Sequence, residues 1–294
     1  MIVFHESRTS ALLRIACAAT LLTLFSLMNR LFLHIPRTGG SSIWLALSRA
    51  AAASGVEIID IYHHSVSRFG DPGHTVEVLR DIPGLHEEGE RLFHHHSWDS
   101  PLGSIPDPVI ATVIRDPVDR MVSEILHYRR VFSDPAISPD HLDYIRGTLG
   151  TRVSGMLDDR TCGISDLVLA AAGTTLYQRY YLGFFEKFLN MDAQPCAGRT
   201  PLSRIVGAVA RRFQEPGRKL ARSARAAFRI MAFDDVEQAY RGISEQFRLS
   251  VPDQGLGLHV NRSTTPFQVD EGLRRKLRRQ LSDDYDFLEA LRRG

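Results

Sequence analysis

Short runs of hydrophobic residues, rich in valine and isoleucine, recur along the chain and are separated by amphipathic segments. The run VIATVI at 109–114 is the clearest predicted strand. Shorter runs predict strands at 31–35 (LFLHI), 56–61 (VEIIDI), 91–95 (RLFHH) and 228–233 (FRIMAF). Strands of this kind that alternate with helices predict an α/β fold.

The segments between the strands have apolar positions at helical spacing. A helix is predicted over 41–53, and Asp116 followed by Pro117 marks the start of another that ends near Val131. Further helices are expected at 139–149, 163–172, 200–213, 218–226, 235–249 and, as one basic helix, 270–293. The expected architecture has three layers, with helices on both faces of a central, mainly parallel sheet. Ligands of such sheets bind beyond the carboxyl ends of the strands.

The composition is that of an ordinary globular protein, with 294 residues of which 44% are hydrophobic and 24% charged. The formal net charge of +2 gives no reason to expect a nucleic-acid partner. The three cysteines, Cys17, Cys162 and Cys196, form no C-x-x-C motif, which argues against a zinc or thioredoxin-like site. A Cys162–Cys196 bridge and fully reduced thiols both remain open.

Residues 1–30 form a hydrophobic extension ahead of the domain expected at 31–294. Their segment 15–28, IACAATLLTLFSLM, has no charge and resembles a signal-peptide core or a short membrane anchor. A membrane-spanning helix needs about 20 apolar residues, which is more than this run supplies. Two interpretations stay open: an accessory segment or over-long start upstream of Met28, and a real anchor that contacts a membrane through residues 11–28.

The stretch PRTGGSS follows the first predicted strand and opens the first predicted helix. Gly39 and Gly40 let backbone N–H groups approach an anion without a Cβ in the way. Ser41 and Ser42 lie at the helix N-terminus, where unpaired N–H groups and the helix dipole favour negative charge. Arg37 adds a fixed positive charge. Together these features predict a phosphate cradle, although a plain turn capped by serine is the alternative.

A second candidate anion loop lies at 113–130, VIRDPVDRMVSEILHYRR. Arg115 stands at the carboxyl end of a strand, and Ser123 follows eight residues later, about two helical turns into the next helix. Both side chains can point toward one site above the sheet and hold a second phosphate. The alternative is that Arg115 pairs with Asp116 or Asp119 and only caps the helix.

The pair HIPRTGGSS and TVIRDPVDRMVSEILHY resembles the two cofactor motifs of sulfotransferases that use 3′-phosphoadenosine 5′-phosphosulfate (PAPS). The resemblance is to the carbohydrate type, similar to heparan and uronyl 2-O-sulfotransferases and bacterial sulfotransferase family 2 proteins. It runs in order from Leu31 to about Leu291, and FHHHSWD, YQRYYLG, HVNRS and LSDDYDFLEAL match weaker elements. The resemblance implies a P-loop-like fold and transfer of a sulfuryl group to a hydroxyl of a saccharide or polysaccharide. The product would be 3′-phosphoadenosine 5′-phosphate (PAP), and no metal is required.

The resemblance also implies which residues bind PAPS. Arg115 and Ser123 would hold the 3′-phosphate, and Arg262 and Ser263 of HVNRS would close over the nucleotide. The family usually has lysine at the position of Arg37, and arginine can stabilise charge on a leaving phosphate but hardly donates a proton. The first loop would hold the 5′-phosphosulfate through six consecutive residues, namely Arg37, Thr38, Gly39, Gly40, Ser41 and Ser42.

Sulfuryl transfer to an alcohol requires a base that works near neutral pH, and histidine suits that task. Strand alternation places His94 and His96 on one face of the sheet and His95 on the other. The resemblance aligns the last of the three with the catalytic base, so His96 is the expected base and His94 the second choice. A solvent-facing histidine cluster and a metal site are the alternatives. His34 is expected to be a core histidine or a support for the loop, and Trp44 to pack in the core.

Two other functions remain open. A P-loop nucleotide kinase would need a Walker lysine after the second glycine, where Ser41 stands, and it would require magnesium. A non-catalytic relative that binds a nucleotide or polyanion would transfer no sulfate, and Arg37 is its main support. The expected location, for a bacterial protein, is the cytoplasm or the cytoplasmic face of a membrane, with a single-pass membrane protein as the alternative.

Overall fold

The computed structural model of the chain describes residues 28–61, 89–96, 102, 105–190, 220–221, 223–224, 227–232, 236–250 and 267–293. Cys162 lies within these ranges and is half-buried. Several sequence-based expectations concern residues outside them, namely the segment 15–27, the helix at 200–213, most of the helix at 218–226, Cys17 and Cys196, and the pair Arg262 and Ser263.

A five-stranded sheet forms the centre of the fold, and its neighbouring strands are all parallel. The spatial order is β2-β3-β1-β4-β5, so the first strand lies in the middle. The strands are β1 Asn29–Leu33, β2 Glu57–Asp60, β3 Arg91–His95, β4 Val109–Ile114 and β5 Phe228–Ala232. Each of the predicted strands is present, which confirms the α/β fold with a central parallel sheet.

β1 begins and ends two residues earlier than its apolar pattern predicts. Arg30, in its polar first half, is only 2% exposed because its guanidinium donates hydrogen bonds to the carbonyl of Phe247 and the carboxylate of Glu90. Ile35 stays fully buried after the strand has ended. Burial therefore does not follow the bounds of the strand, which begins at Asn29.

The predicted basic helix at 270–293 is wrong in one respect, because it is two helices. Leu281 leaves the helical conformation (φ −98°, ψ 23°), and its side chain is buried in the main hydrophobic core. The helices are α2 Gly40–Ala53, α5 Pro117–Val131, α6 Pro139–Asp158, α7 Ile164–Ala172, α8 Thr175–Gln178, α9 Tyr180–Asn190, α12 Val236–Gln246, α13 Glu271–Gln280 and α14 Ser282–Arg292. α6 bends at Gly150 and runs beyond its predicted end, and α8 and α9 were not predicted. None of the helices in the described ranges combines the length and hydropathy that a membrane crossing requires.

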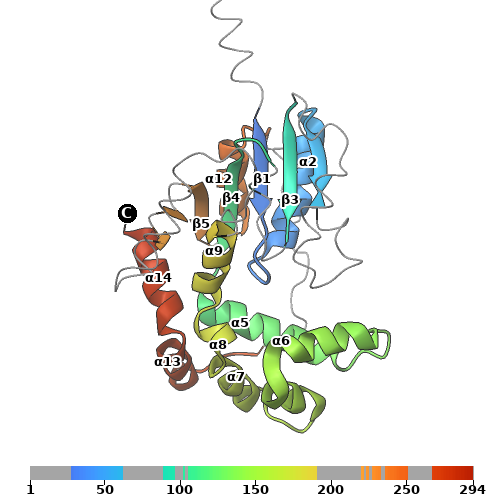
Figure 1. Cartoon of the computed structure of the whole chain (residues 1–294), viewed down its shortest axis with the longest axis vertical. Coiled ribbons are helices and arrows are strands. Elements are labelled where there is room, and N and C mark those ends of the chain that lie inside the picture. The colour runs from blue at the N-terminus through green and yellow to red at the C-terminus, as the bar shows by residue number, and fades with distance from the viewer. Residues whose placement is uncertain are drawn as a thin grey trace, which may run out of the picture.

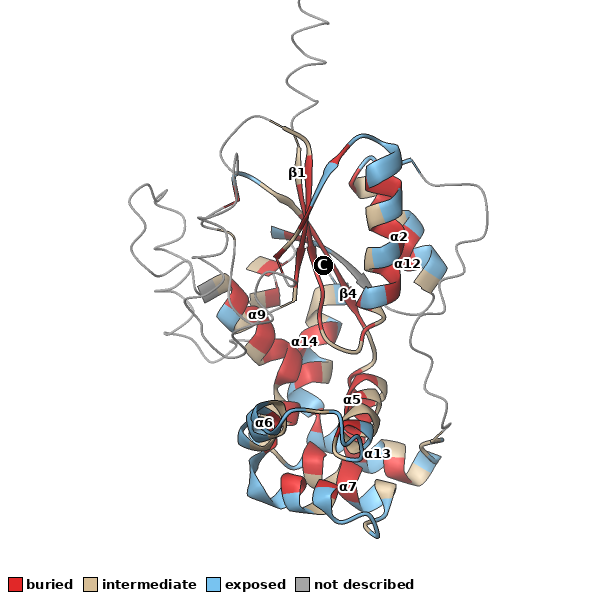
Figure 2. Cartoon of the chain, turned by 90° about the vertical axis from the view of Figure 1, so that its right-hand side faces the viewer, coloured by how far each residue is buried: buried red, intermediate tan, exposed pale blue. Residues whose placement is uncertain are grey.

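Helices cover both faces of the sheet (Figures 1 and 2). α2 and α12 lie together on one face, where Phe32 of β1 points. α9 and α14 lie on the other face, where Leu31 and Leu33 point. Successive strand residues point to opposite faces, so the uninterrupted apolar run of β1 supplies both cores. This is the three-layer arrangement that the sequence predicts.

A second group of helices lies beyond the carboxyl ends of the strands. Figure 1 shows α5, α6, α7 and α13 below the sheet, on the side toward which β1 runs. α5 continues directly from β4 after two residues, and α13 packs against α5 and α7. The loops that follow β1, β3 and β4 therefore face this helical part, where ligands of parallel sheets bind.

A buried carboxylate of α14 holds the start of α9. Asp284 is 1% exposed and accepts hydrogen bonds from the backbone N–H groups of Tyr181 and Leu182, each at 3.1 Å. Burial raises the pKa of Asp284 to about 6, and the two backbone N–H groups oppose the rise. The first N–H groups of a helix lack partners within the helix, so Asp284 acts as a cap supplied from another helix.

Replacing Asp284 by asparagine is expected to change how stability depends on pH. A raised pKa means that the folded protein binds a proton more tightly than the unfolded chain. The free energy of unfolding therefore falls as pH rises from the usual pKa of 3.8 to about 6. Asp284→Asn should remove this slope, whereas Asp286→Asn, which changes an exposed residue of α14, should keep it. Urea unfolding across this pH window measures the slope, and an unchanged slope in Asp284→Asn would contradict the assignment.

Candidate anion and histidine site

Three neighbouring strands end in polar residues at the same edge of the sheet. β1 leads into the loop 34–39, β3 into His96, and β4 into Arg115. β3, β1 and β4 lie side by side and parallel, so these three segments meet beyond their carboxyl ends. The fold thus brings together site residues that the sequence predicts in three separate segments.

The loop between β1 and α2 has a tight, internally bonded backbone. Gly39 has φ 88° and Arg37 has φ 68°, the left-handed conformation that glycine adopts freely and arginine rarely. The hydroxyl of the buried Thr38 donates to the carbonyl of Ile35 at 2.9 Å. The carbonyl of Gly39 accepts from the N–H of Ser42 at 3.1 Å. The Thr38 side chain therefore braces the loop from inside, and its backbone is what remains for a ligand.

Gly40, the first residue of α2, lies directly against the ring of His34. A Cβ at this position would stand 2.0 Å from Cδ2 and 2.5 Å from Nε2 of His34. Any larger residue would displace the ring, so the histidine itself requires glycine here. In the same turn Ser41 is exposed and Ser42 is buried. The first N–H groups of an α-helix lack partners within the helix, although that of Ser42 donates here to the carbonyl of Gly39.

A stacked histidine cluster lies beside this loop. Nδ1 of His94 lies 3.0 Å from Oδ1 of Asp60, and Nε2 of His94 lies 3.2 Å from Nδ1 of His34. The Trp44 indole stacks on His94 with 4.4 Å between ring centroids, and His96 meets His34 edge to face at 4.2 Å. His94 and His96 thus share one face, as predicted, and His34 is a buried, hydrogen-bonded histidine. Trp44 is half-buried and covers His94.

The surroundings keep two of these rings neutral. Burial lowers the pKa of His34 well below 6.5, and His96, His94 and Arg37 lower it further. Burial likewise lowers the pKa of His96 to about 4, with His94 as the next cause. Near neutral pH each of the two rings therefore has one nitrogen that can accept a proton or a hydrogen bond.

Arg115 directly follows β4 and is held by its main chain. The hydroxyl of Tyr181 accepts from the N–H of Arg115 at 3.0 Å and donates to its carbonyl at 2.8 Å. The Arg115 guanidinium donates to the carbonyl of Arg37 at 3.4 Å, which joins the second loop to the first. Sequence reasoning gave Tyr181 no role, because it lies 66 residues from its partner.

The acidic residues next to Arg115 are engaged by the C-terminal helices. Asp116 caps α5, as predicted, and accepts a hydrogen bond from the Tyr285 hydroxyl at 2.7 Å. A guanidinium nitrogen of Arg274 on α13 lies 2.6 Å from Asp119, and the other lies 3.6 Å from Asp116. These two carboxylates thus contact the first turn of α5 and side chains of α13 and α14.

Arg37 and α5 share one electrostatic environment. Burial lowers the pKa of the Arg37 guanidinium, and the Glu124 carboxylate opposes this, followed by Tyr128. Ser123, the neighbour of Glu124, is partly exposed on the same helix. Among the described residues, no hydrogen bond joins Ser123 to Arg115. The structure thus places Arg37 beside α5 but does not link the two predicted 3′-phosphate ligands directly.

A buried ion pair fixes the face of α5 next to Arg37. Arg120 is 1% exposed, donates to Glu124 at 3.1 Å, and lies 3.3 Å from the ring centroid of Tyr180. Burial acts against the charge on Arg120, but Glu124 and the neighbouring tyrosines outweigh it and raise the pKa of Arg120. Arg120 therefore stays charged and ties α5 to α9.

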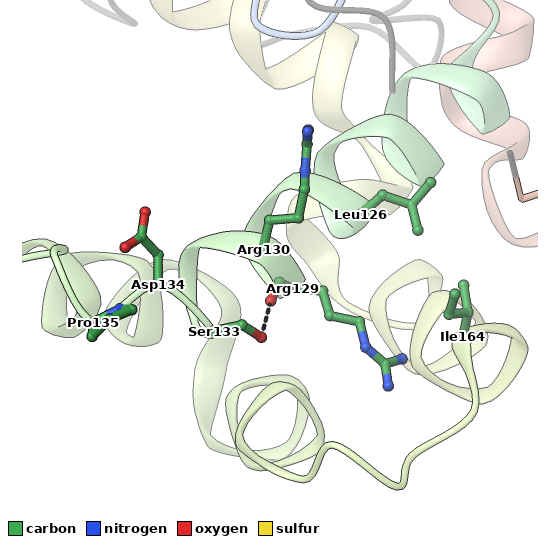
Figure 3. A pocket seen from close by; sticks show the side chains of 7 residues that line it. All are labelled: Leu126, Arg129, Arg130, Ser133, Asp134, Pro135 and Ile164. Carbon is green, nitrogen blue, oxygen red and sulfur yellow. Dashed lines mark hydrogen bonds between the residues drawn. The ribbon is translucent and has the colours of Figure 1, made fainter. Parts of the chain in front are cut away.

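A cavity of about 550 Å³ opens at the last turns of α5 (Figure 3). Arg129 and Arg130 line it from α5, and Ile164 lines it from the start of α7. Arg129 donates to two backbone carbonyls, whereas Arg130 is exposed and interacts electrostatically with Arg37 and His127. Burial, Arg37 and Arg130 lower the pKa of His127 to about 4. Arg130, which lines the cavity, therefore lies near enough to Arg37 for the two positive charges to disfavour each other.

Two of the predicted site residues are not among those that the structure describes. Arg262 and Ser263 fall outside the described ranges. Within them, no group of three or more histidine, cysteine or acidic side chains is arranged to hold a metal ion. Asp60 and Tyr181 were missed by sequence reasoning, since nothing local marks either residue as a partner of His94 or Arg115.

Comparison with known proteins adds a similarity in fold. No protein-family model matches the chain, and no curated protein matches it at a significant level. A solved structure of a sulfotransferase from Alicyclobacillus acidocaldarius is similar, with 16% sequence identity, 90% of this chain and 95% of that chain covered, and a TM-score of 0.42. Similarity of this size does not by itself determine a family or an activity, so the function has to be argued from the site.

Proposed function

We propose that this protein is a sulfotransferase that moves a sulfuryl group from PAPS to a hydroxyl of a saccharide or polysaccharide. One observation carries the proposal: two anion-type loops, after β1 and β4, meet beside a histidine cluster at the end of β3. The reaction needs a place for the 5′-phosphosulfate, a place for the 3′-phosphate and a base for the hydroxyl. The segments after β1, β4 and β3 are the proposed sites of the 5′-phosphosulfate, the 3′-phosphate and the base, in that order.

The loop after β1 is the proposed site of the 5′-phosphosulfate. Backbone N–H groups of residues 38–41 and the positive end of the α2 dipole favour an anion there. Arg37 supplies fixed positive charge for the phosphate that leaves when the sulfuryl group is transferred. Its left-handed backbone and its bond from Arg115 hold it at the junction of the two loops.

The loop after β4 is the proposed site of the 3′-phosphate. Arg115 supplies a planar guanidinium that can bond two phosphate oxygens, and Ser123 supplies a hydroxyl from the next helix. The two hydrogen bonds of the Tyr181 hydroxyl fix the position of the Arg115 backbone, from which the guanidinium side chain extends. Arg262 and Ser263 are proposed to close over the nucleotide.

His96 is the proposed base. Its pKa of about 4 keeps it neutral and able to accept the hydroxyl proton. His94 is the second candidate, but Asp60 and His34 engage both of its ring nitrogens. The cavity at the end of α5 is the proposed place for the saccharide that carries the hydroxyl, since Arg130, which lines it, lies within electrostatic range of Arg37.

Calorimetric titration with PAP, ADP and ATP in the absence of magnesium tests the proposal. Two separate phosphate sites predict tight binding of PAP and much weaker binding of ADP and ATP. A preference for ATP, or a requirement for magnesium, would support a P-loop kinase instead. PAP binding without sulfate transfer from PAPS to any of a panel of saccharides would support the non-catalytic relative.

Tyr181→Phe is expected to weaken PAP binding about tenfold, the equivalent of about 1.4 kcal/mol. The change removes both hydrogen bonds that hold the Arg115 main chain. Adenosine 5′-phosphosulfate, which lacks the 3′-phosphate, should lose little affinity. Tyr240→Phe, in a buried tyrosine of α12 on the far side of the sheet, is the matched control. Equal losses for both nucleotides would mean that Tyr181 supports the fold in general.

A further inference from the structure

A chain of hydrogen bonds leads from a carboxylate to the anion loop. Asp60, the last residue of β2, lies 3.0 Å from Nδ1 of His94, and Nε2 of His94 lies 3.2 Å from Nδ1 of His34. His94 and His34 are 4% and 6% exposed, and Trp44 stacks on His94. The chain crosses β2, β3 and β1, which are neighbours in the sheet.

The carboxylate end of this chain decides which atoms donate and which accept. An ionised carboxylate only accepts, so Nδ1 of His94 donates to Asp60. In a neutral His94 ring, Nε2 then has the lone pair and accepts from the Nδ1–H of His34. His34 thereby uses its only ring proton, and its Nε2 has a lone pair.

That lone pair lies at the N-terminus of α2. The ring of His34 packs against Gly40, and a Cβ at Gly40 would stand 2.0 Å from Cδ2 and 2.5 Å from Nε2. Among the described residues, Nε2 of His34 has no hydrogen-bond partner. A side chain that is more than nine-tenths buried thus has its free nitrogen beside the first residue of α2, where helix N–H groups attract an anion. A lone pair and an anion repel each other, so the two can be neighbours only with a proton between them.

We propose that His34 is a ligand of the anion bound by the loop 37–42, and that it becomes one by taking up a proton on Nε2. Asp60 and His94 are positioning residues that hold the resulting imidazolium in place. This inference rests on the proposed function, in which the anion at this loop is the 5′-phosphosulfate of the donor.

The groups that face His34 decide when it is protonated. Burial opposes a positive charge on the ring most strongly, followed by His96 and His94 of β3 and by Arg37 of the loop. The neutral ring is therefore the resting form. A bound anion places negative charge next to Nε2, and Asp60 places negative charge at the far end of the chain. Both act to raise the pKa of His34 when the anion binds.

The step is the uptake of one proton from solvent. The bond that forms is N–H at Nε2 of His34, while the Nδ1–H groups of His34 and His94 keep their present acceptors. The new N–H donates a charge-assisted hydrogen bond to the anion. Arg37 cannot respond in this way, because its guanidinium stays charged throughout. Anion affinity should therefore rise as pH falls, by up to about tenfold per pH unit between the pKa of His34 in the complex and its lower pKa in the free protein.

Nitrogen-15 NMR of the full chain, labelled on histidine, measures the protonation of each ring nitrogen directly. Sulfate is the probe because it does not titrate near neutral pH, and sodium chloride at equal ionic strength is the control. Without sulfate, His34 should have a proton on Nδ1 and a lone pair on Nε2. With saturating sulfate, Nε2 should become protonated near neutral pH. His34→Gln assigns the resonance.

Two variants distinguish the hydrogen-bond chain Asp60–His94–His34 from other groups that contact His34. Asp60→Asn keeps an oxygen that can accept from His94 but removes the charge, so the pKa of His34 in the sulfate complex should fall. His96→Gln changes a ring that touches His34 but lies outside the chain, and proton uptake at His34 should persist.

The inference is overturned if Nε2 of His34 stays unprotonated in saturating sulfate. It is also overturned if chloride causes the same protonation as sulfate. PAP calorimetry separates this outcome from a failure of the proposed function. If PAP binds while His34 does not respond, only the inference is wrong. If His34 responds to sulfate while PAP does not bind, the loop is a proton-linked anion site in a protein that is not a sulfotransferase.

Discussion

Replacing His96 by alanine is expected to lower kcat by about 10²–10⁴-fold, the range typical for loss of a general base. Affinity for PAP should stay nearly unchanged, because His96 follows β3 and belongs to neither anion loop. Rates of sulfate transfer from PAPS and calorimetric affinities for PAP check the two parts separately. A large loss of PAP affinity would mean that His96 holds the site together structurally.

The pKa of His96 gives this prediction a second readout. A general base works only when it is unprotonated, so kcat/KM of the unaltered protein should fall as pH drops through about 4. The residual activity of His96→Ala should lack this fall. If the fall persists in the variant, another histidine of the cluster accepts the proton, and His96 is not the base.

Arg115→Ala should weaken PAP binding by about 10- to 100-fold, since a hydrogen bond to a charged group contributes about 1.5–3 kcal/mol. The Tyr181 hydroxyl hydrogen-bonds both the N–H and the carbonyl of Arg115 at the end of β4. The backbone that carries the guanidinium is therefore fixed in position. Adenosine 5′-phosphosulfate, which has no 3′-phosphate, should lose much less affinity. Calorimetry with the two nucleotides measures the difference.

The ratio of the two affinities decides the role of Arg115. Its guanidinium also donates to the carbonyl of Arg37, so some loss at the 5′ side is expected in either case. Arg275→Ala, which removes an exposed positive charge from α13, is the control for general electrostatic attraction. Equal losses for both nucleotides in Arg115→Ala would remove this residue from the 3′-phosphate site.

The elements that the sequence predicted well are those with strong local signals. The β-branched run at 109–114 is β4, with the predicted bounds. The pair Asp116 and Pro117 starts α5, because the Asp116 carboxylate accepts from two N–H groups of the first turn. Such signals act within a few residues, so they survive whatever the rest of the chain does.

The elements that were predicted poorly depend on distant contacts. The polar start of β1 is buried because the Arg30 guanidinium donates a hydrogen bond to the carbonyl of Phe247, 217 residues away. The basic helix at 270–293 breaks at Leu281, whose side chain enters a core built by other helices. α9 has its N-terminal cap on α14, about 100 residues later in the chain. Helical periodicity contains no information about such partners.

The sequence by itself determined the five strands, the helices that follow β1 and β4, the loops that contain Arg37 and Arg115, and the histidines at 94–96, because all of these follow from neighbouring residues. Only the tertiary structure decided what these residues touch. The sheet order β2-β3-β1 places Asp60 beside His94 and His94 beside His34. That order determines which nitrogen of His34 meets His94. A hydrogen bond depends on distance in space, and strand order, not separation along the chain, decides that distance.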